Sequence, residues 1–302
     1  MYDLIIIGAG PAGITAGVYA ARKRMNTLVI SPDIGGQAAW SGDIENYTGY
    51  QFITGPELAA KFEEHIRKYN IALKESEAVV ELRKEADIVL VKSNKGQEYQ
   101  SRAAIIASGK RSKELGVPGE EEFKNKGLTY CATCDGPLFS GKDVAVVGGG
   151  NSALDAALQL IQIAGQVYVI NINPDLSGDI IMRQKVEASS KVKIFNNTVV
   201  NAVLGDKMVS GLKIRVMGKE EIIRVQGVFV EIGLIPNAEF TVGIDKNQFG
   251  EIKVNCHNQT NITGIFAAGD VTDVPEKQII IAAGEGSKAA LSVFSYLAQH
   301  KF

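Results

Sequence analysis

Two cysteines with a spacing that suits redox chemistry lie near the middle of the chain, in the segment Cys131-Ala132-Thr133-Cys134-Asp135. Two residues between the thiols allow a reversible disulfide, and the thiolate is the nucleophile in thiol–disulfide exchange. Asp135 follows directly and is a candidate proton carrier, or alternatively a cap for the turn at Gly136-Pro137. The pattern therefore predicts a redox-active dithiol formed by Cys131 and Cys134.

The same spacing also occurs in half of a zinc site, which would need two more ligands nearby. The remaining candidates are Cys256, His65, His257 and His300, and none of them is arranged as a second pair. We therefore expect no metal site. Cys256 stands alone in the polar stretch VNCHNQ, and we expect it to be structural.

A glycine-rich turn, GAGPAG at residues 8–13, follows a short apolar strand at 3–7 and precedes an expected helix at about 13–23 and a strand at 27–30. In a dinucleotide-binding turn of this kind, the three glycines allow a tight bend, a close approach of the backbone to a pyrophosphate, and close packing of helix on strand. The helix N-terminus then faces the phosphates. The residues concerned are Gly8, Gly10, Pro11, Ala12 and Gly13. A purely structural turn is the alternative interpretation.

The acidic residue that usually ends the second strand of such a unit is missing. Ser31 stands near that place, and Asp33 could substitute for it.

The pattern recurs at residues 148–153, GGGNSA, between a strand at 143–147 and a helix that continues to about Gln162, with another strand at 167–172. It predicts a second nucleotide site, although a fold relic that no longer binds is the alternative. The expected binding residues are Gly148, Gly150, Asn151 and Ser152.

A chain of 302 residues exceeds the usual size of a single core, so two domains are expected. The two strand–turn–helix units predict an α/β fold with two Rossmann-like nucleotide-binding domains, the second inserted into the first. The first domain would comprise residues 1–113 and 241–302, and the second residues 114–240, with linkers near 114–118 and 236–241. Further expected elements are a packing helix at 57–69, strands at 88–92 and 228–232, a strand that ends in Gly269-Asp270, and a helix at about 279–298.

Composition excludes several classes of protein. The net charge of −2 gives no basic bias for nucleic acid or a membrane surface, and no run approaches the ~18 apolar residues of a membrane span. The sequence opens on a strand without a basic leader segment, so we expect a cytoplasmic protein.

Together these features resemble the low-molecular-weight thioredoxin reductase family over nearly the whole chain. The matching pieces are GAGPAG at 8–13, Gly35-Gly36-Gln37, Glu45-Asn46-Tyr47, CATCDG at 131–136, GGGNSA at 148–153, Gly269-Asp270, and Gln278 with Ala282-Ala283-Gly284. Three stretches, CDGPLF, GGGNSA and KQIIIAAGEGSKAAL, are most similar to the flavoprotein subunit of alkyl hydroperoxide reductase. That subunit has an N-terminal thioredoxin-like region, which we expect this chain to lack because it opens on the strand at 3–7.

The resemblance implies an FAD-dependent protein-disulfide reductase that acts as a homodimer. The discontinuous first domain would bind FAD, and the inserted domain would bind a nicotinamide nucleotide, carry the CxxC and swing between two positions. Around the FAD the resemblance places Gly36, Gln37, Asn46, Gly269, Asp270, Gln278 and Ile279, with Asp270 on the ribityl chain. The helix that begins near Ile279 would stabilise charge on the reduced flavin. Cys134 would face the flavin, Cys131 would attack the partner disulfide, and Asp135 would move protons.

One departure from the family concerns the electron donor. Members that use NADPH carry a histidine and arginines after the second strand of the inserted domain, whereas residues 171–178 read NINPDLSG here. The amide of Asn171 is suited to a free 2′-hydroxyl, and Asp175 would repel a 2′-phosphate. We therefore favour NADH over NADPH, unless Arg183 or Lys185 folds back to the site.

Four interpretations of the whole chain remain open. The first is reduction of thioredoxin or a thioredoxin-like protein. The second is the reductase component of a peroxiredoxin or alkyl hydroperoxide system. The third is a ferredoxin-driven reductase with a relic nucleotide site. The fourth belongs to a different class, a non-enzymatic flavin redox sensor whose CxxC gates a partner.

Overall fold

The structure is a computed structural model that describes residues 1–41, 43–44 and 46–300, with the side chains of all but Asp43, Thr133 and Cys134 among them. Its internal contacts divide the chain into two compact units. Unit 1 comprises Met1–Arg111 and Ile235–Phe302, and unit 2 comprises Ser112–Leu234. The two chain segments that connect the units, β9 (Lys110–Ser112) and β18 (Leu234–Pro236), pair with each other as a two-stranded sheet.

Unit 1 is built on a seven-stranded sheet in the order β5-β2-β1-β8-β7-β6, with β19 also paired to β8. Its strands are β1 (Tyr2–Ala9), β2 (Thr27–Ile34), β5 (Ala72–Lys74), β6 (Val79–Glu85), β7 (Ile88–Ser93), β8 (Glu98–Ile106) and β19 (Ile265–Ala267). The other elements of unit 1 are α1 (Pro11–Arg22), the 3-10 helix η1 (Gly36–Trp40), the short strands β3 (Asp43–Ile44) and β4 (Ile53–Thr54), α2 (Gly55–Arg67) and α7 (Ile279–Gln299).

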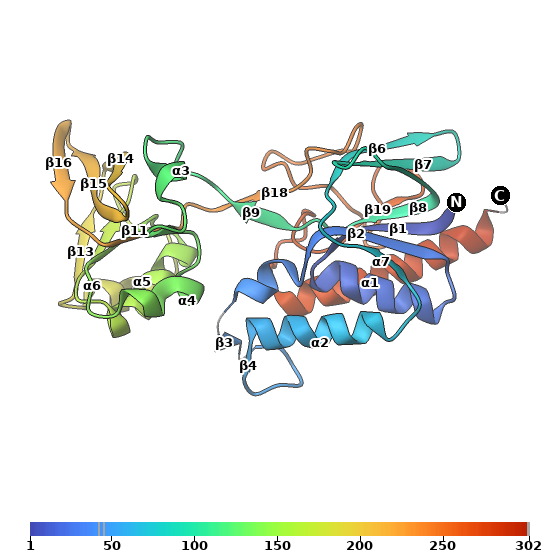
Figure 1. Ribbon diagram of the computed structural model, residues 1–302, viewed down its shortest axis with the longest axis horizontal. Coiled ribbons are helices and arrows are strands. Elements are labelled where there is room, and N and C mark those ends of the chain that lie inside the picture. The colour runs from blue at the N-terminus through green and yellow to red at the C-terminus, as the bar shows by residue number, and fades with distance from the viewer. Residues whose placement is uncertain (42, 45, 301–302) are drawn as a thin grey trace. The chain divides into compact units, whose positions relative to one another are not determined.

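Alternate residues of β1 face two different cores. Leu4 and Ile6 pack with α1 and α7, whereas Ile5 and Ile7 pack against the β6–β7 hairpin and the segment at 238–254. The helices thus cover one face of the sheet and irregular chain covers the other (Figure 1). A parallel sheet covered on both faces requires a nearly continuous apolar strand, which is why residues 4–7 are Leu-Ile-Ile-Ile.

Unit 2 has three layers. Its central parallel sheet runs β10-β17-β11-β12-β13, and a separate antiparallel sheet runs β14-β15-β16. The strands are β10 (Leu128–Thr129), β11 (Val144–Val147), β12 (Val167–Ile170), β13 (Val192–Phe195), β14 (Thr198–Gly205), β15 (Val209–Val216), β16 (Lys219–Ile223) and β17 (Gly227–Val230). The helices are α3 (Glu120–Phe123), α4 (Ala132–Asp135), the 3-10 helix η2 (Gly136–Phe139), α5 (Asn151–Ile163) and α6 (Ile180–Glu187).

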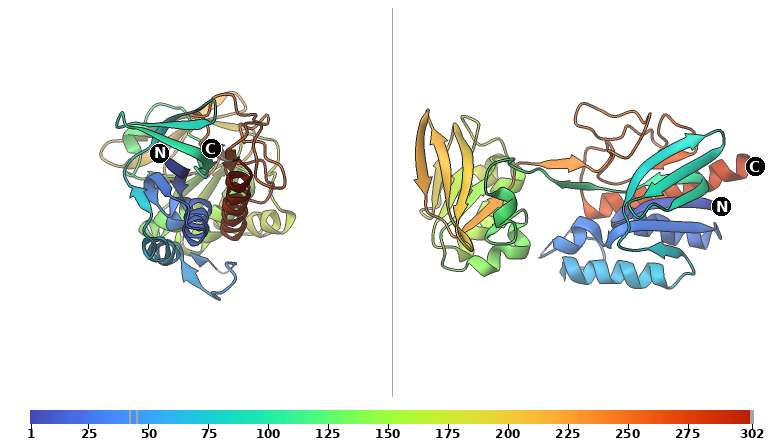
Figure 2. Two further views of the ribbon diagram at one scale, coloured as in Figure 1. Left: turned by 90° about the vertical axis from the view of Figure 1, so that its right-hand side faces the viewer. Right: turned by 45° about the horizontal axis from the view of Figure 1, so that its top comes forward.

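The central sheet of unit 2 also alternates its side chains between two cores. Val144 and Val146 pack with α5 and α6, and Ala145 and Val147 pack with the antiparallel sheet β14–β16. The right-hand view of Figure 2 shows the helices and the two sheets of this unit from a further direction.

One strand is longer than its sequence suggests. The expected strand at 27–30 continues through Pro32 and Asp33 to Ile34, where it pairs with Ala9. Proline lacks the N–H that a central strand needs, which favours an earlier end. The strand β5 pairs only with residues 28–30 of β2, so β2 beyond Ile30 has no partner in β5. The missing N–H of Pro32 therefore removes no hydrogen bond to β5.

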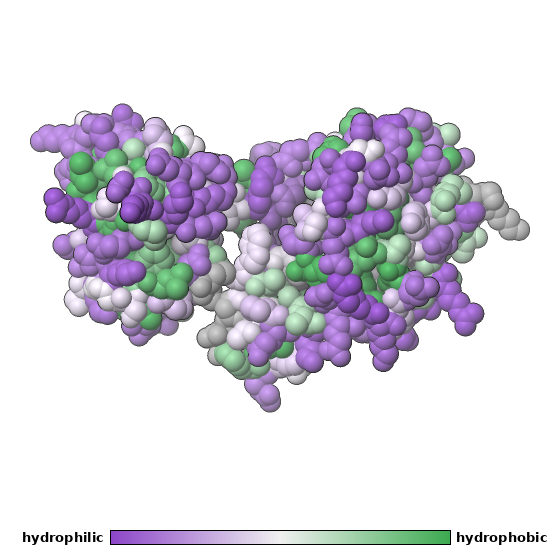
Figure 3. All heavy atoms as spheres, in the orientation of Figure 1, coloured by the Kyte–Doolittle hydropathy of each residue, from purple (hydrophilic) through white to green (hydrophobic). Residues whose placement is uncertain are grey.

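The face of the protein drawn in Figure 3 is mostly hydrophilic, with apolar side chains in scattered groups. Within residues 1–41, 43–44 and 46–300, no helix is long and apolar enough to cross a membrane.

The packing of α1 on α7 gives a first prediction. A Cβ at Gly286 would lie 2.0 Å from the carbonyl oxygen of Ala12, whereas a Cβ at Gly284, one half-turn earlier on α7, would meet nothing within 4 Å. We expect Gly286→Ala to lower the free energy of unfolding by about 1–3 kcal/mol, because the two helices must separate. Gly284→Ala is the matched control and should be neutral or stabilise by up to about 1 kcal/mol. Thermal and urea unfolding of both variants test this, and equal stability of the two would contradict the packing argument.

Candidate functional site

The first glycine-rich turn of unit 1 is so tight that it has no room for a side chain at Gly8 or Gly13. Gly8 has a φ of +106°, and a Cβ there would lie 2.3 Å from the carbonyl oxygen of Ala107. A Cβ at Gly13 would lie 1.9 Å from the carbonyl oxygen of Gly8. Gly10 is the N-cap of α1 and offers no capping side chain, and Pro11 occupies the first helical position. The N-terminal N–H groups of α1 are thus left for a ligand, as a dinucleotide pyrophosphate requires.

The chain approaches the same turn again at residues 35–37. Gly36 has a φ of +54°, and a Cβ there would lie 3.3 Å from the Cα of Gly10. Gln37 lies in the first turn of η1, and its Nε2 donates to the carbonyl oxygen of Lys110 at 2.5 Å. The backbone of this loop therefore lies directly beside the glycine-rich turn.

The C-terminal part of the chain completes this site. Gly269 follows β19 with a φ of +77°, and a Cβ there would lie 2.9 Å from the Cβ of Ala12. Gln278 is the N-cap of α7 without a capping side-chain bond, and α7 begins at Ile279 as the sequence predicts. The Nδ2 of Asn46 donates to the Oε1 of Gln278 at 3.1 Å. Residues from both ends of the chain therefore meet around one turn, while Glu45 of the motif lies outside the described residues.

Asp270 lies next to this turn and is largely buried. Burial raises the pKa of its carboxyl, and the positive charges of Lys277 and Lys110 act in the opposite direction. The oxygens of a carboxyl group at this place can accept hydrogen bonds from ligand hydroxyls. The glycine cradle, the open helix N-terminus and this carboxylate fit a flavin dinucleotide.

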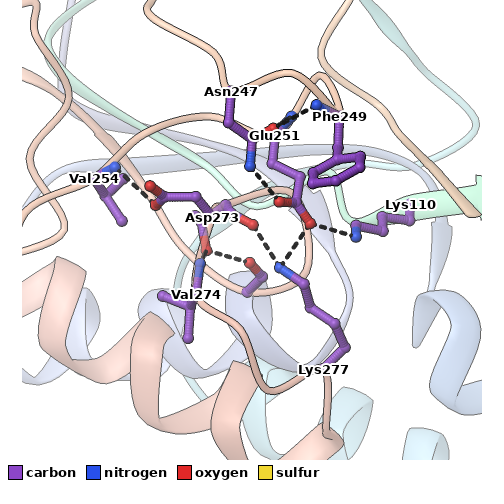
Figure 4. Close-up of polar contacts among 10 residues, drawn as sticks. Lys110, Asn247, Phe249, Glu251, Val254, Asp273, Val274 and Lys277 are labelled. Atoms are coloured by element: carbon purple, nitrogen blue, oxygen red, sulfur yellow. Dashed lines mark hydrogen bonds and ion pairs between the residues drawn. The ribbon is translucent and has the colours of Figure 1, made fainter.

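A charged cluster that the sequence did not reveal holds these segments together (Figure 4). The Nζ of Lys110 lies 2.7 Å and the Nζ of Lys277 3.3 Å from the same Oε1 of Glu251. Asn247 donates to the other carboxylate oxygen at 2.6 Å, and Lys277 also donates to the carbonyl oxygen of Thr272 at 2.5 Å. Burial would raise the pKa of Glu251, but hydrogen bonds from Lys110 and Asn247 and the charge of Lys277 hold it at about 2.

The second glycine-rich turn, in unit 2, repeats the same construction. Gly148 has a φ of +141°, and a Cβ there would lie 2.1 Å from the carbonyl oxygen of Glu231. Gly150 is the N-cap of α5, again without a capping side chain. The loop at 177–179 packs over the turn, because Ser177 N donates to Gly149 O at 2.7 Å and Asp179 N donates to Asn151 Oδ1 at 2.6 Å. The side chain of Asn151 thus holds this loop.

Asn171 follows β12 and is fully buried beneath the turn. Its Nδ2 donates to the carbonyl oxygen of Asn173 at 3.1 Å and to the Oδ1 of Asn196 at 2.9 Å, and its Oδ1 accepts from Asn173 N at 3.2 Å. A Cβ at Gly149 would lie 2.4 Å from that Oδ1. Both amide hydrogens are therefore used within the protein, and a ribose hydroxyl would have to donate to the Oδ1.

The CxxC segment lies at the start of α4 in the same unit, with Cys131 directly before the helix. Cys131 is half-buried and disulfide-bonded, whereas Cys256 in unit 1 is free and exposed. The side chain of Cys134 lies outside those that the structure describes. Among the described residues, no three His, Cys, Asp or Glu side chains gather as metal ligands.

Thr129, which no sequence pattern revealed, orders the start of this segment. Its hydroxyl donates to the carboxylate of Asp135, and its oxygen accepts from the backbone N–H of Cys131 at 3.2 Å. Thr129 ends β10 and is buried, so the carboxylate is held by a rigid element. A single hydroxyl in a buried strand forms no motif that could have identified it.

Glu231, also missed, lies between the two features of unit 2. It follows β17, and its carboxylate accepts hydrogen bonds from the Ser152 hydroxyl and from the backbone N–H of Ala132. Burial raises its pKa to about 7; the negative charge of Asp155 acts in the same direction and the two hydrogen bonds oppose it.

The sequence matches the pyridine nucleotide-disulphide oxidoreductase family over residues 2–286, and the chain therefore belongs to that family. A protein of Bacillus subtilis (strain 168) named NADH dehydrogenase is 41% identical over 299 residues, which cover 98% of this chain and 58% of that protein. The F subunit of alkyl hydroperoxide reductase of Escherichia coli (strain K12) is 40% identical over 307 residues, which cover 99% of this chain and 59% of that protein. The chain thus spans less than two thirds of the length of these two relatives.

A crystal structure of Lactococcus lactis thioredoxin reductase in the FR conformation superposes with a TM-score of 0.88 at 34% identity, covering 99% of this chain and 100% of that chain. The expected α/β fold with Rossmann-type nucleotide domains and the resemblance to low-molecular-weight thioredoxin reductases are thereby confirmed. The family implies FAD and a nicotinamide nucleotide as cofactors.

The Lys110–Glu251–Lys277 cluster gives a second prediction. A pKa of about 2, below the ordinary 4.5, means that ionised Glu251 stabilises the fold above pH 4.5 and that this stability is lost as the pH falls toward 2. We expect Glu251→Gln to lower the free energy of unfolding by about 2 kcal/mol at pH 7 and by clearly less at pH 3.

The matched control is Glu239→Gln, which removes the exposed pair that Glu239 makes with Arg111 at 2.5 Å. It should change stability by less than about 1 kcal/mol. Urea unfolding at both pH values measures the difference, and an equal loss in the two variants would rule out a special role for the cluster.

Proposed function

We propose that the chain is an FAD-dependent protein-disulfide reductase that passes electrons from a nicotinamide nucleotide through the Cys131–Cys134 dithiol to thioredoxin or a thioredoxin-like protein. The observation that carries this proposal is the CxxC helix beside a second glycine-rich turn in unit 2, together with a separate dinucleotide cradle in unit 1. Family membership supports the same chemistry.

Unit 1 would hold the FAD. Gly8 and Gly13 would allow the tight turn, the missing side chain at Gly10 would leave room for the pyrophosphate, and the N-terminus of α1 would face it. Asp270 would accept from the ribityl hydroxyls, while Gly36, Gln37 and Asn46 would line the flavin. The N-terminus of α7 at Gln278-Ile279 would stabilise negative charge. When bound, FAD supplies the two-electron chemistry that links a hydride donor to a disulfide.

Unit 2 would carry the dithiol chemistry. Reduction of the disulfide takes two electrons and two protons and gives two thiols. Asp135, held by Thr129 and one residue beyond the second cysteine, is placed to exchange a proton with this segment. Cys131 would attack the partner disulfide, and Cys134 would resolve the mixed disulfide.

The preferred donor would be NADH. Arginine is absent from residues 171–178, and the guanidinium of Arg183 faces Glu187 at 3.9 Å on α6. A 2′-phosphate would thus lack the charge-assisted contacts that select NADPH. The name of the Bacillus subtilis relative, NADH dehydrogenase, agrees with this choice.

A second candidate function is the reductase component of a peroxiredoxin or alkyl hydroperoxide system, which the Escherichia coli relative favours. Ferredoxin is an alternative electron donor to a nicotinamide nucleotide, because Asn171 has no free amide hydrogen for the ribose.

The resemblance to thioredoxin reductases further supports a homodimer, and a dithiol that must cycle through the reduced form suits the cytoplasm. A non-enzymatic flavin sensor would differ from all of these in showing no turnover with a thioredoxin-like substrate.

The dithiol gives a third prediction. Cys131→Ser and Cys134→Ser should each abolish reduction of a protein disulfide, because exchange needs both an attacking and a resolving thiol. In both variants the donor should still reduce the flavin, seen as a loss of flavin absorbance when donor is added anaerobically. Cys256→Ser, which alters the free and exposed cysteine, is the control and should keep both activities. Normal disulfide turnover in either of the first two variants would remove the dithiol from the mechanism.

The donor gives a fourth prediction. Two missing charge-assisted contacts correspond to about 3–6 kcal/mol, or roughly a hundredfold to ten-thousandfold in affinity. We expect kcat/KM for NADH to exceed that for NADPH at least about tenfold when both are measured under one set of conditions. Arg183→Ala should leave the ratio unchanged. A preference for NADPH would overturn the assignment of NADH. Reduction of the flavin by ferredoxin but by neither nucleotide would show that ferredoxin is the donor.

A further inference from the structure

Glu231 stands at the carboxyl end of β17, between the two chemical features of unit 2. A Cβ at Gly148 would lie 2.1 Å from the carbonyl oxygen of Glu231, so the backbone of Glu231 borders the second glycine-rich turn. Its side chain is half-buried, whereas Ser152 is exposed to solvent. A ligand that reached the start of α5 would therefore meet this carboxyl.

The hydrogen bonds of Glu231 place a carboxylate at the N-terminal turn of α5. Ser152, the second residue of that helix, donates its hydroxyl to Glu231, and the N–H of Ala132 donates from the start of α4. Within the described part of the chain, no ion pair joins Glu231 to a lysine or arginine. Among the described residues its charge is stabilised by these two donors and by the helix N-terminus.

The negatively charged pyrophosphate of a bound dinucleotide needs the same position at the N-terminus of α5. In a Rossmann-type domain the pyrophosphate lies at the N-terminus of the helix that follows the glycine-rich turn. A carboxylate bound to Ser152 occupies the same positive end of the helix and repels a second anion. A neutral carboxyl keeps its hydrogen bonds and loses that repulsion.

We propose that Glu231 is a proton-linked specificity residue of the nucleotide site: its ionised form competes with the pyrophosphate of the dinucleotide for the N-terminus of α5, and its neutral form admits the dinucleotide. The inference rests on the proposed function, because it assumes that unit 2 binds the nucleotide. It adds that binding above about pH 7 takes up one proton.

The groups around Glu231 fix the direction of the effect. Asp155, one turn further along α5, is negative and favours the neutral form. Asp135 at the end of α4 is bound to Thr129, and Cys131, which precedes α4, is in a disulfide and does not titrate in the oxidised protein. With its pKa raised to about 7, Glu231 is neutral below that pH and charged above it. Nucleotide affinity should therefore fall as the pH rises through 7.

The experiment is a calorimetric titration of the oxidised, FAD-loaded protein with ADP-ribose at pH values from 6 to 9. ADP-ribose carries the pyrophosphate without the nicotinamide, cannot reduce the flavin, and has no group that titrates in this range. For the wild type we expect the dissociation constant to rise about twentyfold between pH 6.5 and pH 8.5. For Glu231→Gln, which preserves the shape, can accept through its amide oxygen and can donate to the Ser152 hydroxyl through its amide nitrogen, we expect a constant close to the low-pH value of the wild type throughout.

Two further variants serve as controls. Glu221→Gln removes an exposed carboxylate from β16 in the same unit and should leave the wild-type pH profile unchanged. Asp155→Asn removes the neighbouring charge and should move the midpoint of the profile to lower pH, because the charged form of Glu231 becomes easier to form.

The outcomes separate this inference from the function beneath it. Binding by the wild type that is independent of pH, or a Glu231→Gln variant that keeps the pH dependence, would overturn the proton-linked role and leave the nucleotide site standing. Binding by Glu231→Gln at every pH, with tight binding by the wild type confined to the lower pH values, would support the inference, whereas a wild type that fails to bind even at pH 6 while the variant binds would overturn it. If neither protein binds ADP-ribose at any pH, the nucleotide site of unit 2 is wrong, and both proposals fail together.

Discussion

Backbone lies against backbone at two glycine-rich turns, and the geometry of both candidate sites depends on this close approach. At Gly13 a Cβ would lie 1.9 Å from the carbonyl oxygen of Gly8 at the start of the same turn, and at Gly148 a Cβ would lie 2.1 Å from the carbonyl oxygen of Glu231. Glycine alone permits that distance, and at Gly8 and Gly148 it also permits a positive φ. The helix that follows each turn can then begin at the edge of its sheet, with N–H groups that no capping side chain occupies.

In unit 1 this constraint extends to the far end of the chain. Because β19 pairs with β8, and β8 with β1, the residues that follow these three parallel strands come to one edge. Gly269 therefore lies against Ala12, and α7 packs closely on α1 at Gly286. The Lys110–Glu251–Lys277 cluster then connects the start of β9, the turn at Asn247 and the approach to α7 (Figure 4).

The features that were predictable from the sequence are those with a local pattern. Each glycine-rich turn has fixed spacing, the CxxC is contiguous, and the start of α7 follows a change from polar loop to small and apolar residues. The antiparallel sheet β14–β16 was not predicted, because its alternation is weak and its apolar side faces a core made by other segments. Thr129, Glu231 and Glu251 were missed for a related reason. Each of the three acts through a partner that is distant in sequence or through its burial. A pattern of neighbouring residues reveals neither a distant partner nor burial.

The strand order of unit 2 explains why its missed residues lie together. In the parallel sheet β17 lies between β10 and β11, so the residues that follow these three strands are neighbours at one edge. Those residues are the CxxC segment after Thr129, Glu231 after Val230, and the glycine-rich turn after Val147. A side chain on the middle strand can therefore contact both outer segments, and the carboxylate of Glu231 accepts from Ala132 on one side and Ser152 on the other. The CxxC segment and the second glycine-rich turn thus contact the same carboxyl group, because the strand order places Glu231 between them.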